Sequence, residues 1–278
     1  FSPFLFNGMT FSTGGYSAEF GDALSSVLLM NSIAEPDQDK TEISLMTVGL
    51  GFGKTKKWDK TSLSINTSYI NLKPYQILVP QKLDWNKPYQ GFAGEAIFRR
   101  KFEKGMFKFY VAYDNSMFDL NQEDINSSAK VRIKNNNDNL YVNSSYKGSL
   151  ENGWGLQTGI SLGLNNVKMD FDQSNLKNRE VASHLKLKLD KKFSDRVKSA
   201  FGGDYFITQF DETFTPISGG NFEADFKNNI AAGFVEADIF FSQNFAAKVV
   251  TRAMYSNWIK KSVLEPRISL AYKVSSKS

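Results

Sequence analysis

Apolar and polar residues alternate with a period of two along most of the chain. In the stretch VASHLKLKLD (181–190), Leu185, Leu187 and Leu189 lie on one side of an extended chain, and Lys186 and Lys188 lie on the other. Successive side chains of a strand point to opposite faces, so this segment has an apolar face and a charged face. A soluble sandwich would bury the leucines in its core, whereas a membrane barrel would turn them toward lipid and the lysines toward its lumen.

Eleven segments after residue 40 are predicted to be strands of this kind. They are 43–53, 61–72, 91–101, 105–115, 138–148, 153–165, 180–191, 196–208, 228–242, 244–256 and 264–274. Most have about 9 to 14 residues, whereas strands of globular proteins have about 5 to 6 and tilted membrane strands about 9 to 11. The chain is therefore predicted to be all-β, with strands long enough to cross a bilayer.

The predicted connections alternate between short and long. Short ones are expected at 54–59, 102–105, 150–153, 193–196 and 242–244, and long ones at 72–90, 116–137, 166–179, 209–227 and 257–263. Outer-membrane barrels have this order, with tight periplasmic turns and larger external loops. Aromatic residues also stand beside the short connections, as in the girdle at a lipid headgroup layer: Trp58, Phe102, Trp154, Phe193, Phe241 and Phe245. Together these features favour an antiparallel transmembrane β-barrel.

Composition agrees with an all-β chain and excludes several chemistries. Phe (24) and Tyr (11) are abundant and Pro (7) is scarce, and the absence of cysteine removes disulfides and thiolate catalysis. The net charge of +5 comes from bases intermixed with acids along the chain, so we expect no nucleic-acid partner. The mean hydropathy of −0.36 does not argue against a barrel, because alternating strands average to neutral.

A segment rich in small residues precedes the strands. Its motif consists of Gly14, Gly15, Tyr16, Ser17, Ala18, Glu19, Phe20, Gly21, Leu24, Ser25, Ser26 and Val27. It resembles the end of the plug domain in TonB-dependent outer-membrane receptors, where such a motif leads into the first barrel strand. The resemblance implies that residues 1–36 are the C-terminal end of a plug and that residues 37–278 are the N-terminal half of a barrel.

The same resemblance implies a location and a function. Receptors of this family have about 22 barrel strands, so the chain is expected to be a fragment, with the export signal, the front of the plug and the TonB-contacting segment outside it. We expect it in the outer membrane of a Gram-negative-type bacterium, with lipid, the TonB complex and an extracellular ligand as partners. The expected function is energy-coupled uptake of an iron chelate, cobalamin, an oligosaccharide or a peptide. A smaller closed barrel, porin-like or enzymatic, and a soluble β-sandwich binding module are the alternatives.

Two groups of residues are candidates for this function. Charged residues on the predicted lumen rows either pair with one another or hold the plug: Glu95, Arg99, His184, Lys186, Lys188, Glu236, Asp238, Lys248 and Arg252. Aromatic residues in the predicted external loops could stack on a ligand: Tyr75, Trp85, Tyr89 and Phe214.

No residue pattern points to catalysis. His184 is the single histidine, and no nucleophile accompanies it in the sequence. Asp170, Asp172 and Ser174 have the spacing of a calcium loop, but Asn175 and Val181 replace its required Gly and Glu. We therefore expect no catalytic residue, no metal site and no cofactor.

Overall fold

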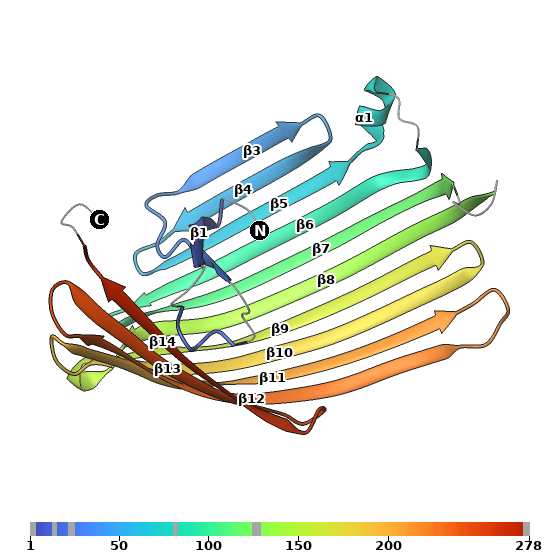
Figure 1. Ribbon diagram of the computed structural model, residues 1–278. Helices are drawn as coiled ribbons and strands as arrows, with labels where there is room; N and C mark the ends of the chain where they lie inside the picture. Colours follow the sequence, from blue (N-terminus) through green and yellow to red (C-terminus); the bar gives the residue numbers. More distant parts are fainter. Residues whose placement is uncertain (1–3, 13–15, 22–25, 80–82, 124–128, 275–278) are drawn as a thin grey trace.

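The computed structural model describes residues 4–12, 16–21, 26–79, 83–123 and 129–274. These residues form a two-stranded ribbon and one twelve-stranded antiparallel sheet, in which the strands follow one another in chain order from β3 to β14 (Figure 1). The ribbon consists of β1 (Phe6–Ser12) and β2 (Val27–Ser32). None of the described helices is long and apolar enough to cross a membrane.

Most strands of the sheet are long. The first six are β3 (Lys40–Met46), β4 (Gly49–Lys57), β5 (Thr61–Asn71), β6 (Asp84–Phe102), β7 (Gly105–Glu123) and β8 (Lys130–Ser149). The last six are β9 (Trp154–Phe171), β10 (Ser174–Lys192), β11 (Val197–Thr215), β12 (Phe222–Phe240), β13 (Phe245–Ser256) and β14 (Lys261–Tyr272). A short helix, α1 (Lys73–Leu78), follows β5, and a 3-10 turn, η1 (Glu151–Gly153), precedes β9.

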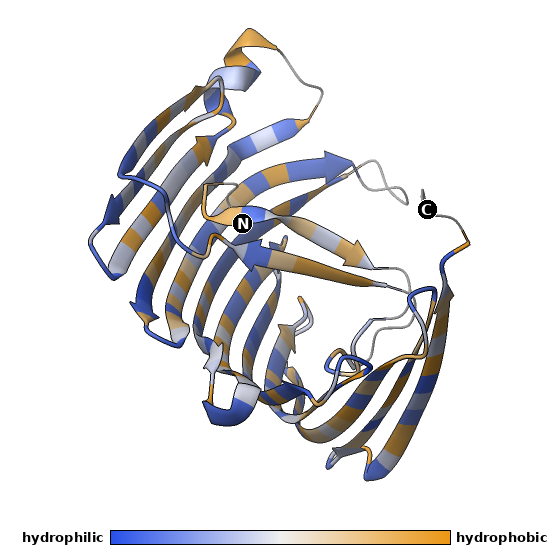
Figure 2. Cartoon of the chain, turned by 90° about the vertical axis from the view of Figure 1, so that its left-hand side faces the viewer, coloured by the Kyte–Doolittle hydropathy of each residue, from blue (hydrophilic) through white to orange (hydrophobic). Residues whose placement is uncertain are grey.

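The sheet is curved, and the ribbon β1–β2 lies in its hollow (Figures 1 and 2). The strands at the two edges, β3 and β14, do not pair with each other, so the described strands form an open part of a barrel. Figure 2 shows polar and apolar residues alternating along the strands. The concave face is therefore the side that receives the N-terminal segment, and the convex face is the outside.

The two faces have opposite polarity, as the alternation predicts for a membrane barrel. On the convex face the side chains of Leu185 and Leu187 are 52% and 48% exposed. On the concave face Arg99 and Arg252 are 2% and 1% exposed. A soluble protein buries leucine and leaves arginine in water, and this chain does the reverse. No second layer covers the leucines among the described residues, so the sandwich alternative is wrong.

The apolar part of the convex face forms a band of limited height. At its lower border Trp154 lies edge-on to Phe193 and Phe201, with ring centroids 5.9 and 5.7 Å apart. At its upper border the row on β10 changes to exposed Arg179 and Lys177. The twelve residue-to-residue steps from Arg179 to Lys191 span about 40 Å of strand, or about 30 Å of height at a tilt of about 40°. That height matches the hydrocarbon core of a bilayer.

Segment 43–53, predicted as one strand, is instead part of the hairpin β3–β4. The chain turns at Thr47 and Val48, so the sheet has twelve strands and not eleven. Gly49 after the turn pairs with Ile70, and a Cβ atom there would collide with the carbonyl oxygen of Tyr69. Apolar residues keep their period of two through Met46, Val48 and Leu50, so the pattern did not reveal a two-residue turn.

The predicted long connections are mostly strand. Segment 166–179 belongs to β9 and β10 except for a turn at 172–173, and segments 116–137 and 209–227 are largely consumed by β7, β8, β11 and β12. Above the apolar band the polarity of the two faces reverses on β9, where Val167, Met169 and Phe171 lie on the concave face and Lys168 and Asp170 on the convex face, while the backbone ladder continues. The strands therefore reach 18 to 20 residues, longer than predicted. The short connections are confirmed, since β6 and β7 are joined by residues 103–104 and β10 and β11 by 193–196.

Candidate functional site

The described part of the sequence motif, residues 16–21, lies against the concave face of the sheet; we call it the docking motif. Ala18 is fully buried and packs with Phe234 of β12 and Val250 of β13. The small side chain of Ala18 lets the backbone of the motif approach these strands. Polar and charged side chains of the sheet surround this apolar contact.

Glu19 joins the docking motif to β10 through two lysines. Its two carboxylate oxygens lie 2.9 Å from the Nζ atoms of Lys186 and Lys188. Burial alone would raise the pKa of Glu19, but the two ammonium groups outweigh it and hold this pKa below its ordinary value. Lys186 also lies over the ring of Phe20, 5.0 Å from the centroid. Glu19 is therefore a carboxylate held at two points at neutral pH.

Glu236 of β12 holds the turn of the docking motif. Its Oε2 accepts hydrogen bonds from Ser17 Oγ at 2.6 Å and from the backbone N–H of Ala18 at 3.0 Å. The backbone N–H of Glu19 donates to Ser17 Oγ at 3.2 Å. Charge-assisted bonds to backbone donors are stronger than neutral ones, so Glu236 fixes the local conformation.

Arg252 of β13 connects the motif with β11. Its Nη1 donates to Asp204 at 2.8 Å and to the carbonyl oxygen of Ala18 at 3.2 Å. A Cβ atom on Gly21 would stand 2.5 Å from Arg252 Nε, so only glycine permits this approach. Asp204 also lies 2.8 Å from Nε2 of His184, which makes this carboxylate the partner of two lumen residues.

A second set of contacts holds the rest of the N-terminal segment. Leu5 is fully buried against Ile97 and Tyr110. Arg99 donates from Nε to the carbonyl oxygen of Ile33 at 2.8 Å and from Nη1 to Ser64 Oγ at 2.9 Å.

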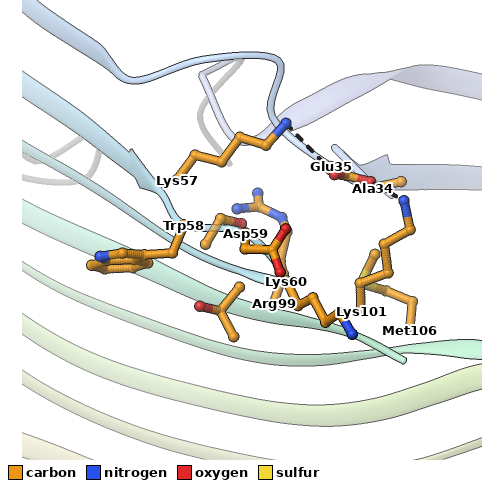
Figure 3. A pocket seen from close by; sticks show the side chains of 11 residues that line it. Ala34, Glu35, Lys57, Trp58, Asp59, Lys60, Arg99, Lys101 and Met106 are labelled. Atoms are coloured by element: carbon orange, nitrogen blue, oxygen red, sulfur yellow. Dashed lines mark hydrogen bonds and ion pairs between the residues drawn. The ribbon is translucent and has the colours of Figure 1, made fainter. Parts of the chain in front are cut away.

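Figure 3 shows the pocket beside these contacts, in which Glu35 lies between Lys57 and Lys101. The Nζ atom of Lys101 is 2.8 Å and that of Lys57 is 3.6 Å from the Glu35 carboxylate. The N-terminal segment thus contacts β4, β6, β7, β10, β12 and β13.

Most of the predicted lumen charges meet the N-terminal segment. Arg99, Lys186, Lys188, Glu236 and Arg252 contact it directly. The others lie on the same face: Asp238 and Lys248 pair with each other at 3.4 Å, His184 pairs with Asp204, and Glu95 lies on the concave face of β6 opposite Asn66.

Besides Lys57 and Lys101, three residues of this contact network were absent from the prediction. Lys108 donates to the carbonyl oxygen of Ser32 at 3.1 Å, Asp204 is the shared partner described above, and Arg267 donates to the carbonyl oxygen of Phe20 at 3.3 Å. Arg267 also lies over the ring of Tyr16, 4.7 Å from the centroid. The alternation on β7, β11 and β14 places all three on the concave face, so the signal was present in the sequence.

Some predicted residues are elsewhere than expected. Trp85 and Tyr89 lie in β6 and Phe214 lies in β11, so these aromatic residues are on strands and not in loops, because the strands extend past the apolar band. Tyr75 lies in α1 within the β5–β6 connection. Gly14, Gly15, Leu24 and Ser25 lie outside the described residues, while Ser26 directly precedes β2.

No protein-family model and no curated protein matches the sequence. Solved structures do match it in fold. The outer membrane transporter YddB from Escherichia coli is similar with a TM-score of 0.72 at 10% identity, over 97% of this chain and 46% of that one. The ferric enterobactin receptor PfeA from Pseudomonas aeruginosa gives 0.68 at 9% identity, over 96% of this chain and 47% of that one.

The alcaligin outer membrane receptor FauA from Bordetella pertussis gives a TM-score of 0.67 at 10% identity, over 91% of this chain and 44% of that one. The chain therefore spans less than half the length of each of these structures. At such low identities the likeness shows the fold. Over its described length, the chain has the fold of part of a TonB-dependent outer-membrane receptor.

Proposed function

We propose that the chain is part of a TonB-dependent receptor that imports a bulky ligand through the outer membrane of a Gram-negative-type bacterium. Residues 1–36 are the end of the plug and residues 37–278 are the barrel wall. The observation that carries this proposal is the seating of the N-terminal segment on the polar, concave face of a sheet whose convex face is apolar. A barrel wall with its own polypeptide inside is the arrangement that a plugged importer requires.

The contacts of the docking motif suit a plug that closes the barrel and must also be able to move when the ligand passes. Glu19 is held by Lys186 and Lys188, and Ala18 is held by Glu236 and Arg252. In a wet lumen, water can replace these polar contacts when the segment moves, whereas an apolar interface would resist opening. A pull from the TonB complex, or a ligand that favours one state, can shift this equilibrium.

The long strands define the orientation that we propose. The short connections face the periplasm, and the strands continue past the apolar band on the external side. The sheet therefore extends beyond the membrane on the external side, and a ligand would contact these strand ends before it reaches the plug. The proposed ligand is one of the bulky classes expected from the resemblance.

Cysteine labelling on intact cells tests the topology. The chain has no native cysteine, so Asp172→Cys in the β9–β10 turn and Asp195→Cys in the β10–β11 turn are unique sites in it. A membrane-impermeant maleimide should label the first in intact cells and the second only after permeabilisation. Equal labelling of both sites in intact cells would contradict the proposal.

A further inference from the structure

A stack of three aromatic rings lies at the end of the sheet opposite the short connections. The Phe210 and Phe226 rings stack at 5.6 Å with an angle of 26°, and the Phe226 and Trp258 rings stack at 5.2 Å with an angle of 29°. We call these three residues the aromatic ladder. Trp258 is 60% exposed, so the ladder ends in a ring that is open to solvent.

The aromatic ladder belongs to the concave face. Phe210 and Asp204 lie on β11 an even number of residues apart, and the pairing of β11 has no register shift between them, so their side chains share a face. The side chain of Asp204 contacts Arg252 under the docking motif, on the concave face. Six residues separate the two positions, so the ladder stands about 20 Å above Asp204 along the strand. Among the residues that the structure describes, no hydrogen bond, ion pair or ring contact joins the N-terminal segment to the ladder, which stands on the external side of the proposed plug contacts.

Two carboxylates flank the ladder. Glu180 of β10 is directly opposite Phe210, and Glu212 follows Phe210 by two residues on the same face of β11. Within the described part of the chain, neither carboxylate has an ion-pair partner. Both are therefore available to a ligand that reaches the rings.

On β6 to β12 the charges on this part of the wall have one sign, whereas Lys260 and Lys261 stand near Trp258 where β14 begins. On β6 to β12, above the row that contains Ile97 and His184, the charged residues of the concave face are Glu95, Asp114, Glu180 and Glu212. Among the described residues of these strands, no lysine or arginine shares that region. Below the row the same face carries the bases that contact the N-terminal segment, such as Arg99, Lys108 and Lys186.

We propose that the aromatic ladder and its two flanking carboxylates bind an organic cation, an ammonium or guanidinium group carried on an apolar or aromatic body. Aromatic faces attract such cations and stack on their bodies, and the carboxylates add charge of the matching sign. An anionic ligand would be repelled by the same carboxylates. This inference rests on the proposed function, in which the ladder lines the external path to the plug.

The binding test uses the purified protein in detergent and a matched pair of probes. Benzyltrimethylammonium is the cationic probe, and phenylmethanesulfonate is its anionic counterpart with the same ring. Titration calorimetry should detect the cation and give much weaker binding of the sulfonate. Glu180→Gln with Glu212→Gln should weaken binding of the cation at least fivefold, and Phe226→Ala should weaken it similarly.

The control is Asp211→Asn with Asp225→Asn, which removes two acids from the same stretch of β11 and β12 but on the convex face, where they oppose each other. This pair should leave binding of the cation unchanged. Equal weakening by the two pairs, or no binding of the cation by the folded parent protein, would overturn the proposal. If another polypeptide segment covers the ladder, Phe226→Ala lowers stability and the cation does not bind, which also overturns it.

The cysteine labelling separates this proposal from the proposed function. If the turn at 172 is outside and the cation does not bind, the cation site is wrong and the receptor topology stands. If the labelling contradicts the topology, the proposed function fails whatever the probe does.

Discussion

The convex and concave faces of β10 come from the same residues of the chain and have opposite environments. Leu187 is exposed on one face, and its neighbour Lys188 is nearly buried on the other, where it meets Glu19. A side chain of β10 is therefore buried when it lies on the face that the N-terminal segment covers, and its hydrophobicity does not decide this. Charged side chains become the covered ones because they have partners inside the curved sheet, and leucines stay uncovered because lipid is their proposed partner.

The largest effect is expected from breaking the buried ion pair of the concave face. Asp204→Ala leaves Arg252 buried without its carboxylate, and removing one partner of such a pair costs about 3 to 5 kcal/mol. Denaturant unfolding in lipid vesicles measures this loss. Asp211→Asn, on the convex face of the same strand, should change the free energy of unfolding by less than about 0.5 kcal/mol. Similar losses of unfolding free energy in both variants would contradict the proposed difference between the two faces.

A charge placed on the convex face should cost somewhat less. Leu187→Arg puts a guanidinium in the apolar band, and such a change costs about 2 to 4 kcal/mol near the bilayer midplane. Lys186→Leu on the adjacent position of the concave face should cost less, because Glu19 keeps its ion pair with Lys188. Unfolding in vesicles or the yield of membrane insertion measures both. Equal tolerance of the two changes would mean that the convex face does not meet lipid.

The next test addresses the close approach of the docking motif. Gly21→Ala places a Cβ atom 2.5 Å from Arg252 Nε, so the arginine or the motif must move. Overpacking of this kind costs about 1 to 3 kcal/mol, and protease cleavage within the N-terminal segment should become faster. Gly163→Ala on β9 is the control, since its Cβ would be 3.9 Å from the nearest atom. Equal cleavage of the two variants would argue against the seating of Gly21.

The smallest effect is expected from acid. Because the pKa of Glu19 is lowered in the folded state, its stabilising contribution is present above the ordinary value of 4.5 and is lost as the pH falls through the lowered pKa. Hydrogen exchange of residues 16–21 should therefore accelerate below about pH 4.5. Glu19→Gln should show fast exchange at neutral pH and little further change in acid. If hydrogen exchange of Glu19→Gln depends on pH as in the parent protein, Glu19 is not the group that causes the acceleration in acid.

The sequence predicted the faces of the sheet better than the ends of its strands. The alternation of Leu185, Lys186 and Leu187 needed only the geometry of an extended chain. The motif around Glu19 led to the expectation of a plug, which stays a prediction. Strand ends could not be found from residues such as those at 172–179, because Asn178 on the concave face is as polar as Lys177 and Arg179 on the convex face. Asp204 was missed for another reason, since its importance depends on Arg252 and Ala18, which are distant in the sequence.

The contacts of Ala18 imply an order of assembly. Ala18 bonds to Glu236 and Arg252, which lie 218 and 234 residues later in the chain. Contacts between such distant residues form late, because a long loop must close first. The N-terminal segment is synthesised before its binding surface, so it can dock only after β12 and β13 have joined the sheet.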